Sequence, residues 1–418
     1  MRCNHLSQYQ PVSSIVVWAA LRRKVDREPV QVRWLDPSQG IDQECLVSLG
    51  TPLQVIQELP IGSTQKVLMP GLVDLYSHSG EPGHEERETL ESLIKGARAG
   101  GFVEVAILPD TEPVIDDPAL VSWLKKRVPN LHILASLTVG NQGKELVDTE
   151  ELLRAGAIGF TAEDALKDLT LTRRFLEYLG PNAAPVLLWP QHPGLAKGVA
   201  REGVWSTALG LIGVPVQAET IAVSTILDLV ELTGTPVHLM RLSSQESVER
   251  IRVAKAKGLP VTCSVTVAHL LHTVEELASF DPNLRVNPPF GTEEDQAALV
   301  AGLADGTVDA IATDHSPWTY EEKVVPFAVA PPGMVMLELA LPLLWTHLVE
   351  TKKLKALDLL RALTTGPRQV LGLTASDSWV LFNPETTWTV NSQTIHSLSQ
   401  ATPWWGKTLQ GCVEQTSF

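Results

Sequence analysis

The stretch that decides the fold reads Met69-Pro70-Gly71-Leu72-Val73-Asp74-Leu75-Tyr76-Ser77-His78-Ser79-Gly80-Glu81-Pro82-Gly83. An apolar run ends in a Pro-Gly turn, a short strand follows, and polar residues appear where that strand stops. In a parallel α/β barrel, the side chains that do chemistry stand at the carboxyl ends of the strands. The stretch therefore predicts the first strand of such a barrel, with His78 at its open end.

Downstream of this strand, apolar strand-like runs alternate with segments of helical period. The predicted strands are Leu72–Tyr76, Val103–Leu108, His132–Leu137, Ile158–Phe160, Val186–Trp189, Val237–Leu242, Val261–Ser264 and Ala310–Thr313. The predicted helices include Glu85–Ala99, Ala119–Arg127, Glu219–Leu232, Ser244–Lys257, Asp295–Ala304 and, as the last barrel helix, Gly333–Glu350. Eight strands alternating with helices predict an α/β fold, a TIM-type (β/α)8 barrel with right-handed crossovers.

Both ends of the chain have a different pattern. Residues 1–14 are polar and aperiodic, which predicts a loose N-terminal extension. Residues 15–67 alternate short apolar segments with turn residues, and strand character returns after about Thr374. We therefore expect residues 15–67 and 375–418 to form one small β domain, and residues 68–374 to form the barrel.

Composition excludes several functional classes. The 418 residues are 44% hydrophobic and can bury a sizeable core, and a formal net charge of −15 argues against binding of a phosphate backbone. No apolar run approaches the ~20 residues that a membrane-spanning helix needs, and no signal peptide is predicted. The four cysteines are widely spaced, which is typical of reduced thiols in a cytoplasmic protein; they are Cys3, Cys45, Cys263 and Cys412.

Further motifs follow in a fixed order. They read Leu108-Pro109-Asp110-Thr111, Arg285-Val286-Asn287-Pro288-Pro289 and Ala312-Thr313-Asp314-His315-Ser316-Pro317. Together with the opening stretch, they resemble the dihydroorotase family, zinc hydrolases of the amidohydrolase superfamily. The resemblance covers roughly residues 66 to 415 and implies the amidohydrolase type of barrel, with a small β-sheet domain built from both chain ends.

The resemblance also shows which of the family's site residues this chain lacks. On the opening strand, Tyr76 stands at the first metal histidine and Gly80 at the arginine that clamps the substrate. Asp110 stands at an asparagine that holds the substrate. After later strands, Trp189 and Arg241 stand at two further metal histidines.

Two or three of the family's metal ligands remain in this sequence. His78 and Asp314 match the family's pattern, and Glu163 is a third candidate in the turn after the fourth strand. Zinc lowers the pKa of its bound water from 15.7 to about 7, so without the ion the hydroxide fraction falls by roughly eight to nine orders of magnitude. A general base such as Asp314 contributes only about 10²–10⁴.

The replacements predict a remodelled barrel mouth. A buried carboxylate that has lost a dication needs another positive charge, because an unpaired buried charge is costly. We expect Arg241 to lie within reach of Asp314, Glu163 or both. Tyr76 and Trp189 are larger than histidine and should fill the space that metal, water and substrate would occupy.

From these residues we expect a catalytically inactive dihydroorotase homologue that is not an enzyme and holds no metal or cofactor. The resemblance implies a structural, non-catalytic subunit that supports aspartate carbamoyltransferase in pyrimidine biosynthesis, with assembly into a homo-oligomer left open. One alternative is an active zinc amidohydrolase, a dihydroorotase or related cyclic amidase, with a reduced metal site of His78, Glu163 and Asp314. Another is a pocket that binds a small-molecule effector without turnover.

Overall fold

The computed structural model describes residues 29–50, 53–60, 62, 65–162, 166–181 and 184–417. The loose extension expected at residues 1–14 lies outside this part of the chain, as does Glu163. Within it, no helix is long and apolar enough to cross a bilayer.

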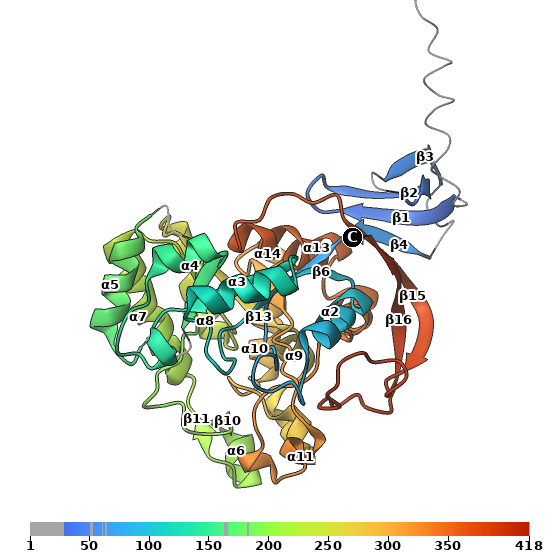
Figure 1. Ribbon diagram of the computed structural model, residues 1–418. Coiled ribbons are helices and arrows are strands. Elements are labelled where there is room, and N and C mark those ends of the chain that lie inside the picture. Colours follow the sequence, from blue (N-terminus) through green and yellow to red (C-terminus); the bar gives the residue numbers. More distant parts are fainter. Residues whose placement is uncertain are drawn as a thin grey trace, which may run out of the picture.

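Eight parallel strands form the central barrel, with helices around it (Figure 1). Neighbouring strands follow one another as β5-β6-β7-β8-β9-β12-β13-β14, and β14 lies beside β5. Their bounds are β5 Leu72–Ser77, β6 Phe102–Ile107, β7 Leu131–Ser136, β8 Gly159–Ala162, β9 Val186–Leu188, β12 Val237–Leu239, β13 Val261–Thr266 and β14 Ala310–Ala312. The predicted fold class is confirmed.

Side-chain and backbone bonds join the first and last strands of the barrel. The buried Asp74 carboxylate of β5 accepts a 2.7 Å hydrogen bond from the backbone N–H of Thr313. One turn further, the backbone N–H of His78 donates to the carbonyl of His315 at 2.8 Å. These two bonds therefore bring the residues that follow β5 and those that follow β14 to the same place.

The helices alternate with the strands along the chain. Their bounds are α2 Leu90–Ala99, α3 Pro118–Arg127, α4 Thr149–Ala155, α5 Leu169–Leu179, α6 Val204–Leu209, α7 Gln217–Thr233, α8 Gln245–Ala256, α9 Val267–Leu271, α10 Glu293–Asp305, α11 Tyr320–Lys323, α12 Ala340–Leu344, α13 Ala356–Leu363 and α14 Thr365–Val370. Short 3-10 turns span Val139–Asn141, Val274–Ser279, Pro282–Leu284 and Phe327–Val329. Side-chain caps fix several starts; the Ser244 hydroxyl, for example, accepts from the backbone N–H of Ser247.

Two helices begin later than the sequence predicts. The helix expected from Glu85 begins at Leu90, because Thr89 caps it and Glu88 lies buried against His315 instead. The helix expected from Gly333 begins at Ala340 and continues as a π-helical turn, Trp345–Glu350. Residues before Ala340 bond to the same imidazole, whose Nδ1 accepts from the backbone N–H of Met336 at 3.2 Å. Helical periodicity continues through both segments, but tertiary hydrogen bonds override it.

A second sheet is built from both ends of the described chain (Figure 1). Its strand order is β16-β15-β4-β1-β2-β3, with bounds β1 Val30–Asp36, β2 Ile41–Ser48, β3 Gln54–Glu58, β4 Val67–Pro70, β15 Trp379–Thr389 and β16 Thr408–Thr416. Strand β15 pairs antiparallel with β4, and β4 leads directly into β5. A separate sheet from the chain termini is thus confirmed, and the domain bounds given above stay a prediction. A separate two-stranded sheet pairs β10 Ala200–Arg201 with β11 Gly213–Val214, and α6 lies between these strands in the chain.

Candidate active site at the barrel mouth

The side chains singled out in the sequence come together because each follows a barrel strand. His78 follows β5, Asp110 follows β6, and Arg241 follows β12 by two residues. Trp189 directly follows β9, and Asp314 follows β14 by two residues. Since the carboxyl ends of parallel barrel strands meet at one face, the five side chains lie at one mouth.

Arg241 occupies the centre of this mouth. Its Nε and Nη2 lie 2.9 and 2.7 Å from Asp314 Oδ1, and Nη2 lies 3.1 Å from His78 Nε2. The guanidinium stands 4.9 Å from the ring centre of Trp189 and 5.6 Å from that of Tyr76, which is within cation–π range. Only 4% of the Arg241 side chain is exposed. The predicted pairing of Arg241 with Asp314 is confirmed, and its pairing with Glu163 falls on a residue outside the described chain.

The backbone at both members of this ion pair is strained. Arg241 has a φ of 53° and Asp314 a φ of 51°, in the left-handed region that residues with a Cβ rarely adopt. Such a conformation costs of order 1–3 kcal/mol per residue and persists where surrounding contacts over-determine it. At Arg241 one such contact is the hydrogen bond that its backbone N–H donates to the Tyr76 hydroxyl at 3.2 Å.

His78 and Asp110 form a second pair at the mouth. His78 Nδ1 lies 2.5 Å from Asp110 Oδ2, and its Nε2 lies 3.7 Å from Asp314 Oδ1. Burial lowers the pKa of His78, but the charges and hydrogen bonds of the two carboxylates outweigh it and raise that pKa to about 10. For Asp314, burial alone would raise the pKa, but the Arg241 charge and His78 lower it to about 2. Both carboxyl groups are therefore ionised near neutral pH, and the imidazole carries a proton that it can donate.

Beneath these charges the barrel is filled. Tyr76 is completely buried, and its hydroxyl lies 3.0 Å from the Ser264 hydroxyl, which also lies 2.9 Å from His238 Nε2. Burial, helped by the Lys255 charge, lowers the pKa of His238 to about 3, so this imidazole is neutral. The aromatic side chain at position 76 thus closes the barrel below Arg241, as its size predicts.

Gly80 is a position where the local backbone excludes any side chain. A Cβ there would collide with the backbone of His84 and of Glu88. The loop after β5 is folded tightly enough that the arginine which the resemblance assigns to this position has no room without rearrangement. The mouth takes its positive charge from Arg241 instead.

The described residues do not fit a zinc ion at this place. The two ligand candidates that the structure describes, His78 and Asp314, both contact the Arg241 guanidinium, a permanent cation in the position that a dication would need. Within the described ranges, no group of three or more His, Cys, Asp or Glu side chains is arranged to hold a metal. A reduced zinc site of His78, Asp314 and Glu163 is therefore not supported by the part of it that the structure contains.

The sequence analysis predicted no role for the carboxyl group of Asp74. Burial raises its pKa to about 7, against hydrogen bonds from Thr313 and Ser77 that lower it. A second omission is the 2.9 Å hydrogen bond from Gln191 to Asn287, which links the loop after β9 to the loop after α9. The only signal for either was the position of these residues after strands or in the Asn-Pro-Pro motif.

Comparisons with known proteins show the family of this chain and other proteins that share its fold. Residues 65–247 match the family described as "Dihydro-orotase-like". A "Probable dihydroorotase-like protein" of Synechocystis is 41% identical over 429 aligned residues, covering 92% of this chain and 97% of the relative. The chain belongs to the dihydroorotase-like family. A dihydroorotase of Pelotomaculum thermopropionicum is 38% identical, covering 84% of this chain and 85% of the relative. The L-hydantoinase of Arthrobacter aurescens has the same fold, with a TM-score of 0.76, 20% identity and 92% and 93% of the two chains covered.

The comparisons correct one expectation. The sequence predicted a non-enzymatic, catalytically inactive member of the dihydroorotase-like family, and that prediction is wrong, because relatives that match over most of the chain are named as the enzyme dihydroorotase. The physical reason is that replaced zinc ligands argue against one way of activating water. They do not argue against a reaction site made of the charged groups that remain.

Proposed function

We propose that this chain is a hydrolase that opens a cyclic amide of the dihydroorotate kind at the mouth of its barrel. The observation that carries the proposal is the charged group at that mouth, where His78, Asp110 and Asp314 keep 22%, 35% and 18% of their side chains exposed. The dihydroorotases at 36–38% identity support the substrate class. The place of the group supports it too, because reactions in such barrels occur at this face.

The remaining residues suit the two proton movements that ring opening requires. Water must lose a proton as it attacks the carbonyl carbon, and the ring nitrogen must gain one as the C–N bond breaks. Asp110 is the accessible carboxylate that accepts the first proton, and His78, protonated near neutral pH, donates the second. A positioned acid or base contributes typically 10²–10⁴ in rate, so slow turnover is expected. No step is assigned to a metal, because the described residues do not fit one.

The test is a dihydroorotate hydrolysis assay on the purified chain with and without a chelator. We expect slow, saturable turnover that survives chelation. His78→Asn should lower kcat by about 10² or more, since it removes the proton donor. The matched control is His347→Asn, on the π-helical turn after α12, where the imidazole bonds only a backbone carbonyl of the preceding turn among the contacts seen. Turnover no faster than in buffer, or turnover that zinc restores after chelation, would contradict the proposal.

A partner remains a prediction. The resemblance implies association with the catalytic chain of aspartate carbamoyltransferase, and a hydrolase acting on dihydroorotate would then sit beside the enzyme of the preceding step. A tagged chain purified from the native host should carry that partner through size-exclusion chromatography, and the same elution gives the number of copies of this chain. Elution without the partner, at the mass of this chain or of its own oligomer, would contradict the association.

A further inference from the structure

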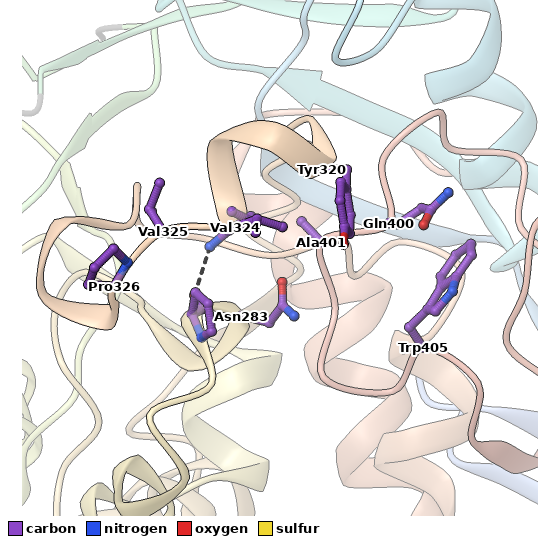
Figure 2. A pocket seen from close by; sticks show the side chains of 10 residues that line it. Asn283, Tyr320, Val324, Val325, Pro326, Gln400, Ala401 and Trp405 are labelled. Carbon is purple, nitrogen blue, oxygen red and sulfur yellow. Dashed lines mark hydrogen bonds between the residues drawn. The ribbon is translucent and has the colours of Figure 1, made fainter.

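A cavity of about 480 Å³ lies outside the barrel mouth, among three segments that are distant in sequence (Figure 2). One is the 3-10 turn Pro282–Leu284, one is α11 with the residues that follow it, and one is the loop from Gln400 to Trp405. Cavities that hold small molecules commonly measure about 300–1,000 Å³. This one is large enough for a ring compound and takes no part in the chemistry proposed above.

The wall of the cavity is mostly apolar and partly aromatic. Tyr320 and Trp405 line it together with Val324, Pro326 and Ala401, and Figure 2 shows all five side chains around one space. Tyr320 is 64% exposed and Val324 59% exposed, so much apolar surface is uncovered beside the hollow. Aromatic side chains of this kind stack on flat rings.

A buried lysine supplies one polar group to the cavity. Lys323 is only 4% exposed, and its Nζ donates to the carbonyls of Pro282 at 3.1 Å and Pro331 at 2.8 Å. An ammonium group has three N–H donors, so these two bonds leave one for a further acceptor. Burial and the charge of Arg285 lower the pKa of Lys323 to about 7 against the opposing charges of Asp281 and Glu322. A ligand oxygen would stabilise the protonated form.

An asparagine supplies the complementary polar group. The side-chain oxygen of Asn283 is buried and has no hydrogen-bond partner within the described ranges, and Asn283 lines the cavity. A buried acceptor without a donor costs about 1–3 kcal/mol, which a ligand N–H would recover. Lys323 Nζ bonds the carbonyl of Pro282, the residue before Asn283, and both Lys323 and Asn283 line the cavity.

We propose that this cavity is a second binding site, for a planar cyclic amide or imide whose ring carries an N–H beside a carbonyl, as uracil does. The ring N–H donates to Asn283, the ring carbonyl accepts from Lys323, and the ring faces pack on Tyr320 and Trp405. A simple aromatic ring would use the walls and leave Asn283 unpaired. A simple carboxylate would use Lys323 and bring no donor.

The experiment is calorimetric titration of the full chain with uracil and with 1,3-dimethyluracil, whose ring nitrogens carry no hydrogen. Uracil should bind with a Kd of about 1 mM or tighter, a range within reach of a ring of this size. Dimethyluracil should bind at least about tenfold more weakly, since Asn283 then stays unpaired. Equal binding of the two compounds, or no saturable binding of uracil at ten times that concentration, would overturn the proposal.

Variants place the binding in this cavity rather than at the barrel mouth. Tyr320→Ala changes a side chain that is mostly exposed, so the chain should fold while uracil affinity falls by about tenfold. Asn283→Leu should bring uracil down to the affinity of dimethyluracil. Trp123→Ala, at an aromatic residue 42% exposed on α3, is the matched control and should bind normally.

His78→Asn distinguishes this site from the proposed reaction site. That variant should keep uracil binding while it loses turnover, because His78 does not line the cavity. Loss of uracil binding in His78→Asn with retention in Tyr320→Ala would place the ligand at the barrel mouth and overturn the second site. Failure of the hydrolysis assay alone would leave the cavity proposal standing.

Discussion

Two buried cations, Arg241 and Lys323, lie in segments that follow barrel strands. The groups that balance their positive charges differ. Arg241 bonds the carboxylate of Asp314 and lies within cation–π range of two aromatic rings. Lys323 is as deeply buried, yet its Nζ bonds only neutral carbonyls in the contacts seen, and the nearest carboxylates act on it through charge alone. At the mouth, a full negative charge balances the guanidinium. At the cavity, the peptide dipoles balance the ammonium only in part.

The difference appears in the titration of each neighbourhood. The Arg241 charge, with His78, keeps the pKa of Asp314 at about 2, so this pair stays ionised across the physiological range. Burial and the nearby Arg285 lower the pKa of Lys323 to about 7, so this ammonium titrates near neutral pH. The mouth therefore holds charges that stay fixed near neutral pH, whereas the cavity holds a cation with an unused N–H that suits a ligand oxygen.

The largest expected effect on the free energy of unfolding comes from removing Arg241, the cation that a carboxylate balances. Arg241→Met should lower the free energy of unfolding by about 3 kcal/mol, because it leaves the carboxylate of Asp314 partly buried without its cation. Denaturant unfolding at neutral pH measures it. Arg252→Met is the matched control, since that guanidinium bonds Glu249 and Asp305 at the surface and should cost no more than about 1 kcal/mol.

A double variant decides whether the unpaired charge is the cause. Arg241→Met combined with Asp314→Leu should recover part of the lost stability, since both charges are then removed. If the double variant is as unstable as the sum of the single variants, lost packing at Arg241 explains the effect and the ion pair does not.

Much of the fold was predictable because it depends on local pattern. Eight apolar strand runs separated by helical segments fix a parallel barrel whatever the details of the loops. The starts of two helices were not predictable, because Glu88 and Met336 bond the imidazole of His315 across the molecule. Periodicity along the chain contains no information about such a partner.

The site was predictable in position and only partly in geometry. Motif register placed each side chain after its strand, and charge balance predicted the bond from Arg241 to Asp314. The 2.5 Å contact between His78 and Asp110 was not predicted, since Asp110 was interpreted only as a replacement for an asparagine that holds the substrate. The left-handed backbone at Arg241 and Asp314 had no signal either, because neither residue is glycine. It arises from contacts with side chains of other strands.

The second largest effect is the contribution of Lys323 to the pH dependence of the free energy of unfolding. Between its unfolded pKa near 10.5 and its folded pKa of about 7, Lys323 binds fewer protons in the folded chain, so its contribution to stability rises with pH. Lys323→Met removes this contribution. Relative to wild type, its free energy of unfolding should fall by about 1.5 kcal/mol between pH 7.5 and pH 9. Lys353→Met, at an exposed residue, should show no such slope; a flat difference for Lys323→Met would contradict the lowered pKa.

The smallest expected effect has the opposite sign and belongs to the mouth. His78 has a folded pKa of about 10, above its unfolded value near 6.5, so its stabilising contribution is complete below about pH 6.5 and is lost as pH rises through 10. Because 22% of the side chain is exposed, solvent screening reduces the effect to about 1 kcal/mol between pH 7.5 and pH 9. His78→Asn should therefore gain stability relative to wild type over that window, measured by denaturant unfolding. Wild type should show a nearly flat profile there, since the slopes of His78 and Lys323 oppose each other. A difference between His78→Asn and wild type that does not change over this window would mean that the imidazole is neutral and accepts a hydrogen bond from Arg241 instead.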